Sequence, residues 1–188
     1  MEPKIMDVEC LNRLLVVVFA LLSAATQGKS QSINAIENIA NFPYLTAVYS
    51  STSTAGSDNL LCLHAVLTQY DPDAGNVTYV WFLRGGDGKE RPVVHRIYEG
   101  DYPEQVKDFS SDDPTHPAPA TVIYTDFKTC FILRTDNMEG QCILWVNSQF
   151  MNDFSQECIR QYQERCGEGV ALYDEAVCNE KKSHEEKI

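Results

Sequence analysis

The stretch VTYVWFLR, residues Val77–Arg84, decides the fold class of this chain. Successive side chains of a strand point to opposite faces of a sheet. One face of this stretch carries Val77, Tyr79, Trp81 and Leu83, and the other carries Thr78, Val80, Phe82 and Arg84. Both faces are partly apolar, which indicates a strand with one face in a core and the other partly shielded. A sandwich strand and a barrel strand covered by a helix both fit this pattern.

Short runs of β-branched and aromatic residues, separated by Gly, Asp, Asn, Pro and Ser clusters, recur across residues 34–146 and are typical of an all-β domain. Turn chemistry at 71–76, 85–88 and 136–140 supports the breaks between them. We expect a surface loop at Phe109–Ala118, which contains Pro114 and Pro117. The predicted strands are Tyr44–Ser51, Leu60–Tyr70, Val77–Arg84, Pro92–Glu99, Ala120–Asp126, Thr129–Arg134 and Gln141–Val146.

A helix is predicted after the last strand, at Asn152–Cys166. Its apolar residues and cysteines share one helical face, and Gly167 and Gly169 are stop signals. The residues of that face are Phe154, Cys158, Ile159, Tyr162 and Cys166. The tail 179–188 is charged, and we expect a frayed end.

The apolar run Leu14–Ala25 is typical of the central region of a signal peptide, and polar residues follow it. The run is too short to cross a bilayer, which needs roughly 20 apolar residues in a helix. We therefore predict a signal peptide at 1–28, a mature domain at 29–188 and secretion from the cell. The alternative interpretation is a buried N-terminal helix.

The chain is acidic, with a formal net charge of −12. Removing residues 1–28, which carry two basic and three acidic side chains, leaves −11. Such a charge repels nucleic acid and anionic membrane surfaces and attracts small cations, although it is also a common means of solubility. We expect neither a nucleic acid nor a membrane as partner.

Six cysteines remain once Cys10 leaves with the predicted signal, and an even number in an exported chain implies disulfides. Six cysteines allow fifteen pairings. In the predicted helix, eight residues separate Cys158 from Cys166, an axial rise of about 12 Å. Because disulfide Cα atoms lie within roughly 7 Å, each of these two cysteines must bind another part of the domain. No C-x-x-C pair indicates a metal site, and we expect no metal or cofactor.

Four blocks in the second half of the chain resemble the salivary lipocalins of ticks, the histamine-binding protein family. The resemblance covers roughly 36–178, although the Gly-x-Trp of most lipocalins is missing, since no Trp precedes Trp81. The blocks are Tyr124-Thr125-Asp126 with Cys130, Cys142-Ile143-Leu144-Trp145-Val146, Glu157-Cys158 with Tyr162 and Cys166, and Leu172-Tyr173-Asp174 with Cys178.

The resemblance implies an all-β fold, an eight-stranded antiparallel lipocalin barrel with a C-terminal α-helix packed on its outside. It implies a protein secreted in saliva that sequesters a small host mediator to evade host defence. It also implies the disulfides Cys62–Cys178, Cys130–Cys158 and Cys142–Cys166. The interior of such a barrel is either filled by side chains or holds one small ligand, and the residues alone leave both possibilities open.

An amine site inside a barrel needs buried carboxylates, with aromatic faces adding cation–π attraction. Amine-binding members of the family resemble one another in an Asp after the strand cysteine and a Glu before Leu-Trp, where this chain has Phe131 and Ile143. Strand carboxylates usually face water, and barrel aromatics usually fill space. The candidate ligand-binding residues are Tyr49, Glu90, Tyr98, Glu99, Tyr124, Asp126 and Trp145.

We rank a biogenic amine, histamine or serotonin, ahead of a lipid mediator such as a leukotriene or fatty acid. A lipid carboxylate would require a cation, for which Arg84, Arg91 and Arg96 are candidates. A host defence protein bound through the barrel loops is a third hypothesis.

An enzyme is the least supported class, because no nucleophile–base pairing can be argued around the histidines. The four histidines of the chain are His64, His95, His116 and His184. Asn76-Val77-Thr78 fits the N-glycosylation pattern, so Asn76 is a candidate glycosylation site. We expect a monomer.

Overall fold

A computed structural model describes residues 32–55, 58–84, 89–135 and 140–179. The predicted signal peptide and residues 180–188 of the charged tail lie outside the described residues. No helix within the described residues is long and apolar enough to span a membrane.

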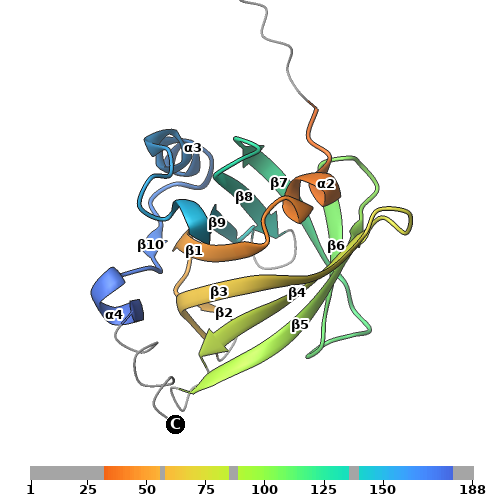
Figure 1. The fold of residues 1–188 in the computed structure, drawn as a ribbon, viewed down its shortest axis with the longest axis horizontal. Coiled ribbons are helices and arrows are strands. Elements are labelled where there is room, and N and C mark those ends of the chain that lie inside the picture. The colour runs from red at the N-terminus through yellow and green to blue at the C-terminus, as the bar shows by residue number, and fades with distance from the viewer. Residues whose placement is uncertain (1–31, 56–57, 85–88, 136–139, 180–188) are drawn as a thin grey trace, which may run out of the picture. The chain divides into compact units, whose positions relative to one another are not determined.

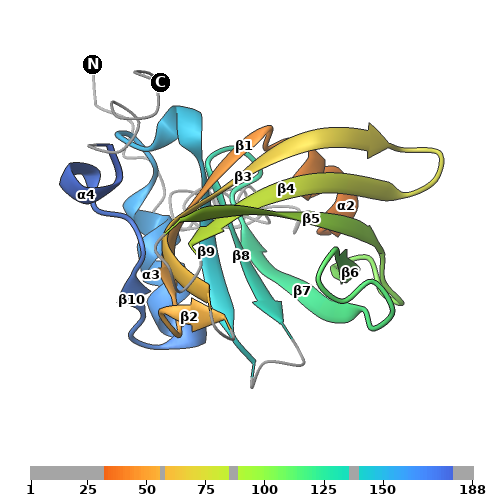
Figure 2. The ribbon, with the colours of Figure 1, turned by 90° about the horizontal axis from the view of Figure 1, so that it is seen from below.

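The described strands form one antiparallel sheet that closes on itself, because β1 pairs with β9 on one side and with β3 on the other (Figures 1 and 2). The strands of the barrel are β1 (Tyr44–Ser50), β3 (Asp58–Asp71), β4 (Asn76–Arg84), β5 (Glu90–Glu99), β6 (Gln105–Ser110), β7 (Ala118–Thr125), β8 (Cys130–Thr135) and β9 (Cys142–Asn147). The short strands β2 (Thr54–Ala55) and β10 (Val170–Ala171) extend the sheet. The predicted eight-stranded barrel is therefore confirmed.

Four short helical segments accompany the sheet in the part of the chain that the structure describes. They are α2 (Ala35–Ala40), the 3₁₀ turn Ser148–Phe150, α3 (Gln156–Cys166) and α4 (Glu175–Asn179). The predicted C-terminal helix is confirmed, but it begins at Gln156 instead of Asn152. The reason is local: the Ser155 hydroxyl accepts a hydrogen bond from the Glu157 amide at 3.1 Å and caps the first turn.

Strand β6 and helix α2 were not predicted from the sequence, and neither were the short elements β2, β10, α4 and the 3₁₀ turn. Strand β6 overlaps the start of the expected loop Phe109–Ala118, and its sequence QVKDFS buries only Val106 completely. Helix α2 has six residues and begins where the Asn34 side chain accepts a hydrogen bond from the Glu37 amide at 3.1 Å. The β6 sequence carries no clear hydrophobic period. In α2 the apolar residues Ala35, Ile36, Ile39 and Ala40 do have helical spacing, but six residues are too few for this pattern to predict a helix.

The barrel interior contains the face of β4 that alternation predicted. Val77, Tyr79 and Leu83 belong to the main core cluster, and Trp81 packs against it. The Tyr79 hydroxyl donates to the carbonyl oxygens of Ile39 at 2.8 Å and Phe42 at 2.6 Å. These bonds fix α2 and the residues after it against the inside of the barrel.

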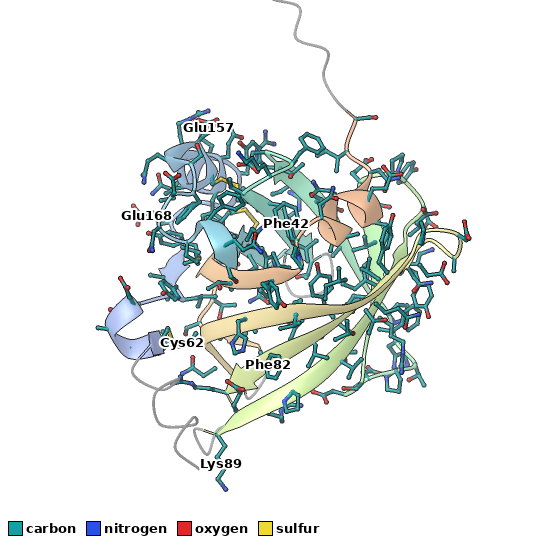
Figure 3. All side chains as sticks on the ribbon, viewed as in Figure 1. Phe42, Cys62, Phe82, Lys89, Glu157 and Glu168 are labelled. Atoms are coloured by element: carbon teal, nitrogen blue, oxygen red, sulfur yellow. A yellow bond between two sulfur atoms is a disulfide. The ribbon has the colours of Figure 1, made fainter. Side chains whose placement is uncertain are left out.

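Helix α2 closes one end of the barrel, where it contacts β4, β5, β6 and β7 (Figure 2). Its buried residues Ile36 and Ile39 join the core cluster. Phe42 follows the helix and points into the barrel, where its ring lies 5.1 Å from the Phe131 ring (Figure 3).

Helix α3 covers β8 and β9 from outside, above a second cluster that includes Ile132, Leu144 and Tyr162. Three disulfides connect the C-terminal segments to the barrel, in the pairing that the family resemblance implied. They are Cys130–Cys158, Cys142–Cys166 and Cys62–Cys178, with Cα–Cα distances of 6.4, 6.1 and 5.5 Å. The first two join α3 to β8 and β9, and the third joins α4 to β3, where Cys62 lies beside that helix (Figure 3).

Candidate functional site

A polar pair lies inside the barrel, formed by His95 of β5 and Asp108 of β6. Alternation on β5 turns His95 inward together with Val93 and Ile97, and alternation on β6 turns Asp108 the same way as Val106. The two side chains meet across the strands, with His95 Nδ1 2.7 Å from Asp108 Oδ2. His95 is 8% exposed, so the pair is nearly buried.

Trp81 lies directly beside this pair, and Trp145 lies beside Trp81. The Trp81 ring stacks on the His95 ring, with centroids 4.0 Å apart and an interplanar angle of 23°. Trp145 of β9 meets Trp81 edge to face at 4.9 Å and is 1% exposed. We call the four residues Trp81, His95, Asp108 and Trp145 the luminal site.

Two atoms of the luminal site, His95 Nε2 and Asp108 Oδ1, are buried and find no hydrogen-bond partner among the described residues. A buried polar atom without a partner costs about 1–3 kcal/mol. Such atoms mark a place for a water, an ion or a ligand. The Asp108 side chain keeps 17% of its surface exposed, so solvent reaches the pair from one side.

The positions at which amine-binding family members carry acids are apolar here and lie inside the barrel. Phe131 is 2% exposed and Ile143 is 4% exposed, and both belong to the main core cluster. Asp108 instead supplies a carboxylate to the interior from β6.

Of the seven candidate residues taken from the sequence, the structure places Trp145 at the luminal site. Tyr49 and Tyr124 lie on the outer side of the barrel, next to α3. The Tyr49 ring packs on the Tyr162 ring at 5.8 Å, and the Arg165 guanidinium lies 6.0 Å from the Tyr124 ring centroid. Both tyrosines thus contribute to the packing of the helix on the barrel.

Asp126 organises the turn between β7 and β8. Its Oδ1 accepts hydrogen bonds from the backbone amides of Lys128, Thr129 and Cys130 at 2.9, 2.7 and 2.9 Å. Its Oδ2 accepts a bond from the Thr129 hydroxyl. Burial opposes ionisation, but these bonds outweigh it, so the pKa of Asp126 lies below its ordinary value.

Glu90, Tyr98 and Glu99 are exposed residues of β5. Glu90 pairs across the sheet with Arg84 and lines a groove of about 590 Å³ beside His64 and Phe82. Tyr98 is 39% exposed and meets the Phe109 ring edge to face at 5.6 Å. These three residues therefore lie apart from the luminal site.

The three arginines proposed for a lipid carboxylate are dispersed. Arg84 lines the groove just described, and Arg91 binds Asp112 in the loop after β6 at 2.7 Å. Arg96 is exposed, opposite Thr78 of β4.

Sequence reasoning missed Trp81, His95 and Asp108 as site residues. The alternation Val93, His95, Ile97 was the signal that could have placed His95 inside. Asp108 had no such signal, because β6 was not predicted as a strand.

A closed antiparallel barrel of eight strands, closed at one end by a short N-terminal helix and flanked by a C-terminal helix, is a lipocalin. The chain belongs to the tick histamine-binding protein family, whose sequence profile matches residues 24–179. The family and the fold are those of proteins that bind small ligands. No curated protein shows significant sequence similarity to the chain.

Solved structures with the same fold include AM182 in complex with serotonin, which is 12% identical over 79% of this chain and 95% of its own, with a TM-score of 0.59. Japanin from Rhipicephalus appendiculatus, bound to cholesterol, is 15% identical over 77% of this chain and 99% of its own, with a TM-score of 0.57. H1 crustacyanin from the lobster Homarus americanus is 11% identical over 84% of this chain and 86% of its own, with a TM-score of 0.56.

Proposed function

We propose that this protein is secreted in tick saliva and sequesters a biogenic amine, histamine or serotonin, in the luminal site. The observation that carries the proposal is the Asp108 carboxylate, held inside the barrel by His95 and bordered by Trp81. Removal of the mediator would help the parasite to evade host defence.

The chemistry of the site suits a cation. An ammonium group that leaves water needs replacement partners, and Asp108 Oδ1 and His95 Nε2 are both without one among the described residues. A cation over an indole face adds about 0.5–2 kcal/mol. The net charge of −11 after removal of residues 1–28 also favours the approach of a cation.

Relatives and covalent structure support the wider proposal. AM182 was solved with serotonin, although that likeness by itself establishes only the fold. The apolar run Leu14–Ala25 and the three disulfides are typical of an exported protein.

The site supports binding and not hydrolysis, even though Ser110 lies across the sheet from His95. A serine nucleophile requires a hydrogen bond to its base. Here the Ser110 hydroxyl accepts a bond from the Asp113 amide at 3.1 Å, whereas His95 Nε2 has no partner among the described residues.

Titration with histamine, followed by tryptophan fluorescence and calorimetry, tests the proposal, because both tryptophans report from the site. Replacing Asp108 by Asn should weaken binding by roughly tenfold to a hundredfold, the value of a hydrogen bond to a charged group. The matched control is Asp101→Asn, which alters a surface pair with Lys107. Equal binding by wild type and Asp108→Asn contradicts the proposal.

A lipid mediator is the second candidate, and the apolar side chains of Phe131 and Ile143 in the interior favour it. Leukotriene belongs in the same titration series. Binding of the lipid without any amine would reverse the ranking, and no heat from histamine, serotonin or leukotriene would favour a host protein as partner.

A further inference from the structure

The glycosylation motif Asn76-Val77-Thr78 lies at the start of β4, on the outer face of the barrel. Val77 is fully buried, so alternation turns Asn76 and Thr78 outward. Asn76 is half-buried, and its side chain forms no hydrogen bond with the described residues. A glycan is bulky and is accommodated only at a protein surface. The fold therefore leaves room for a sugar at the position that the sequence motif indicates.

Tyr98 of β5 lies directly opposite Asn76 in the antiparallel ladder. The Glu99 amide donates to the Gly75 carbonyl oxygen at 3.1 Å, which continues the pairing of the two strands beyond this point. Ile97 is buried, so Tyr98 faces outward as Asn76 does. Directly opposite residues on antiparallel strands have Cβ atoms about 4.5–5.5 Å apart. The Tyr98 ring is thus within reach of the first sugar of a glycan on Asn76.

The Tyr98 ring is held in position but is not covered. Phe109 of β6 meets it edge to face, with centroids 5.6 Å apart and an interplanar angle of 90°. Lys107, which lies opposite Tyr98 on β6, is bound to Asp101 at 2.7 Å. Tyr98 nevertheless keeps 39% of its surface exposed. Because a neighbouring ring already restricts it, Tyr98 loses little conformational freedom when another group packs on its exposed part.

We propose that the first N-acetylglucosamine of a glycan on Asn76 packs against the Tyr98 ring and joins β4 to β5 from the outside. The pyranose ring of this sugar presents C–H groups on its faces. The π face of an aromatic ring carries partial negative charge, which attracts such groups. The contact also removes apolar surface of Tyr98 from water.

This contact strengthens a part of the barrel that has no covalent cross-link. The disulfides attach to β3, β8 and β9, and β4 and β5 contain none within the described residues. Figure 1 shows β4 and β5 on the side of the barrel away from α3, which contacts β8 and β9. The sugar lies on the outer face, whereas the luminal site faces inward. The inference therefore does not depend on the proposed ligand.

Thermal unfolding of the secreted glycoprotein tests the contact. Wild type and Tyr98→Leu are each compared with the same protein carrying Thr78→Ala, which removes the glycosylation motif but keeps Asn76. The stabilisation that the glycan provides, measured as the rise in Tm, should be about 2–4 °C larger in wild type than in Tyr98→Leu, as expected for one packing contact in a domain of this length. The cost of Thr78→Ala itself cancels, because both comparisons contain it.

Tyr70 provides a matched control, since it is 41% exposed but lies opposite Val77 and not opposite Asn76. In Tyr70→Leu, the glycan should raise the Tm by as much as in wild type. Enzymatic trimming of a high-mannose glycan to a single N-acetylglucosamine should also preserve the rise, because the first sugar makes the contact.

Nuclear magnetic resonance of the wild-type glycoprotein decides the proposal even if Tyr98→Leu fails to fold. The protons of the first sugar should move upfield, because they lie over an aromatic ring. Sugar protons at the positions seen in a short glycopeptide, or an equal rise in Tm in wild type and Tyr98→Leu, would overturn the contact. A secreted wild type that carries no glycan would overturn it as well.

Discussion

Trp81 of β4 lies nearly parallel to His95 of β5, with ring centroids 4.0 Å apart. In this contact the His95 ring covers one face of the Trp81 indole, so a cation–π contact with a bound amine would use the opposite face. Trp81→Leu should therefore weaken amine binding by roughly threefold to thirtyfold, the range of a cation–π contact. Titration calorimetry measures the loss. Phe82→Leu changes the neighbouring residue on the outer face and should leave affinity unchanged, and an equal loss in both variants would assign the effect to general destabilisation of β4.

The Tyr79 hydroxyl connects β4 to the segment that closes the barrel. Tyr79→Phe removes two hydrogen bonds and leaves the carbonyl oxygens of Ile39 and Phe42 without this donor. We expect the free energy of unfolding to fall by about 1–3 kcal/mol. Urea denaturation measures it, with Tyr98→Phe as the exposed control. A loss no larger than that of the control would show that these two hydrogen bonds do not hold α2 in place.

Asp126 should make the stability of the fold depend on pH. Its pKa is lower in the folded chain than in the unfolded one, so its contribution is present above the unfolded value near 4 and is lost as the pH falls through the folded value. Asp126→Asn should cost about 1–2 kcal/mol at pH 7, because the amide keeps one acceptor but loses the charge. The difference from wild type should shrink below about pH 4. Asp153→Asn, at an exposed position, is the control for thermal unfolding, and a difference that persists at pH 2 would contradict this explanation.

The disulfides should differ in their contribution to stability according to the loops that they close. Cys62–Cys178 spans 116 residues, and Cys142–Cys166 spans 24. In the chain-entropy model, removal of these bridges costs about 5 and about 3.5 kcal/mol. Guanidinium unfolding of the two double alanine variants measures the order, and a non-reducing peptide map checks the pairing. A peptide that joins Cys158 directly to Cys166 would be incompatible with α3.

Asn76 is predicted to carry an N-linked glycan. It begins β4, it has Thr78 on the same face, and it pairs across the sheet with exposed Tyr98. Expression in a secreting eukaryotic cell should yield a protein whose mass falls on enzymatic removal of N-glycans. Asn76→Gln should lack that shift, and an unmodified wild type would exclude the site in that host.

Most of the barrel could be predicted because its strands alternate clearly, as Val77–Arg84 does. Tyr49 and Tyr124 show why alternation alone did not identify which candidate residues face the barrel interior. Register shifts between Ala47 and Tyr49, and between Val122 and Tyr124, interrupt the ladders. Ala47 and Val122 face the core, whereas the tyrosines after the shifts face α3. A β-bulge of this kind reverses the face of the following residues and leaves no hydrophobic signature in the sequence.

The luminal pair escaped prediction for a different reason. His95 and Asp108 come together only through the register of β5 and β6, which pairs His95 with Ser110 and Ile97 with Asp108. A polar strand such as β6 is held by its neighbours and not by its own pattern. Fifteen possible cysteine pairings, by contrast, were reduced by the family resemblance to the one that the structure contains.

The three disulfides attach to β3, β8 and β9. Within the described residues, β5 and β6, which carry His95 and Asp108, contain no disulfide. The polar pair of the luminal site and the disulfides therefore lie on different strands of the barrel. Substitutions at His95 and Asp108 can thus alter the chemistry of the interior without touching a disulfide, so a lineage built on this scaffold can change what it binds while it keeps its cross-links.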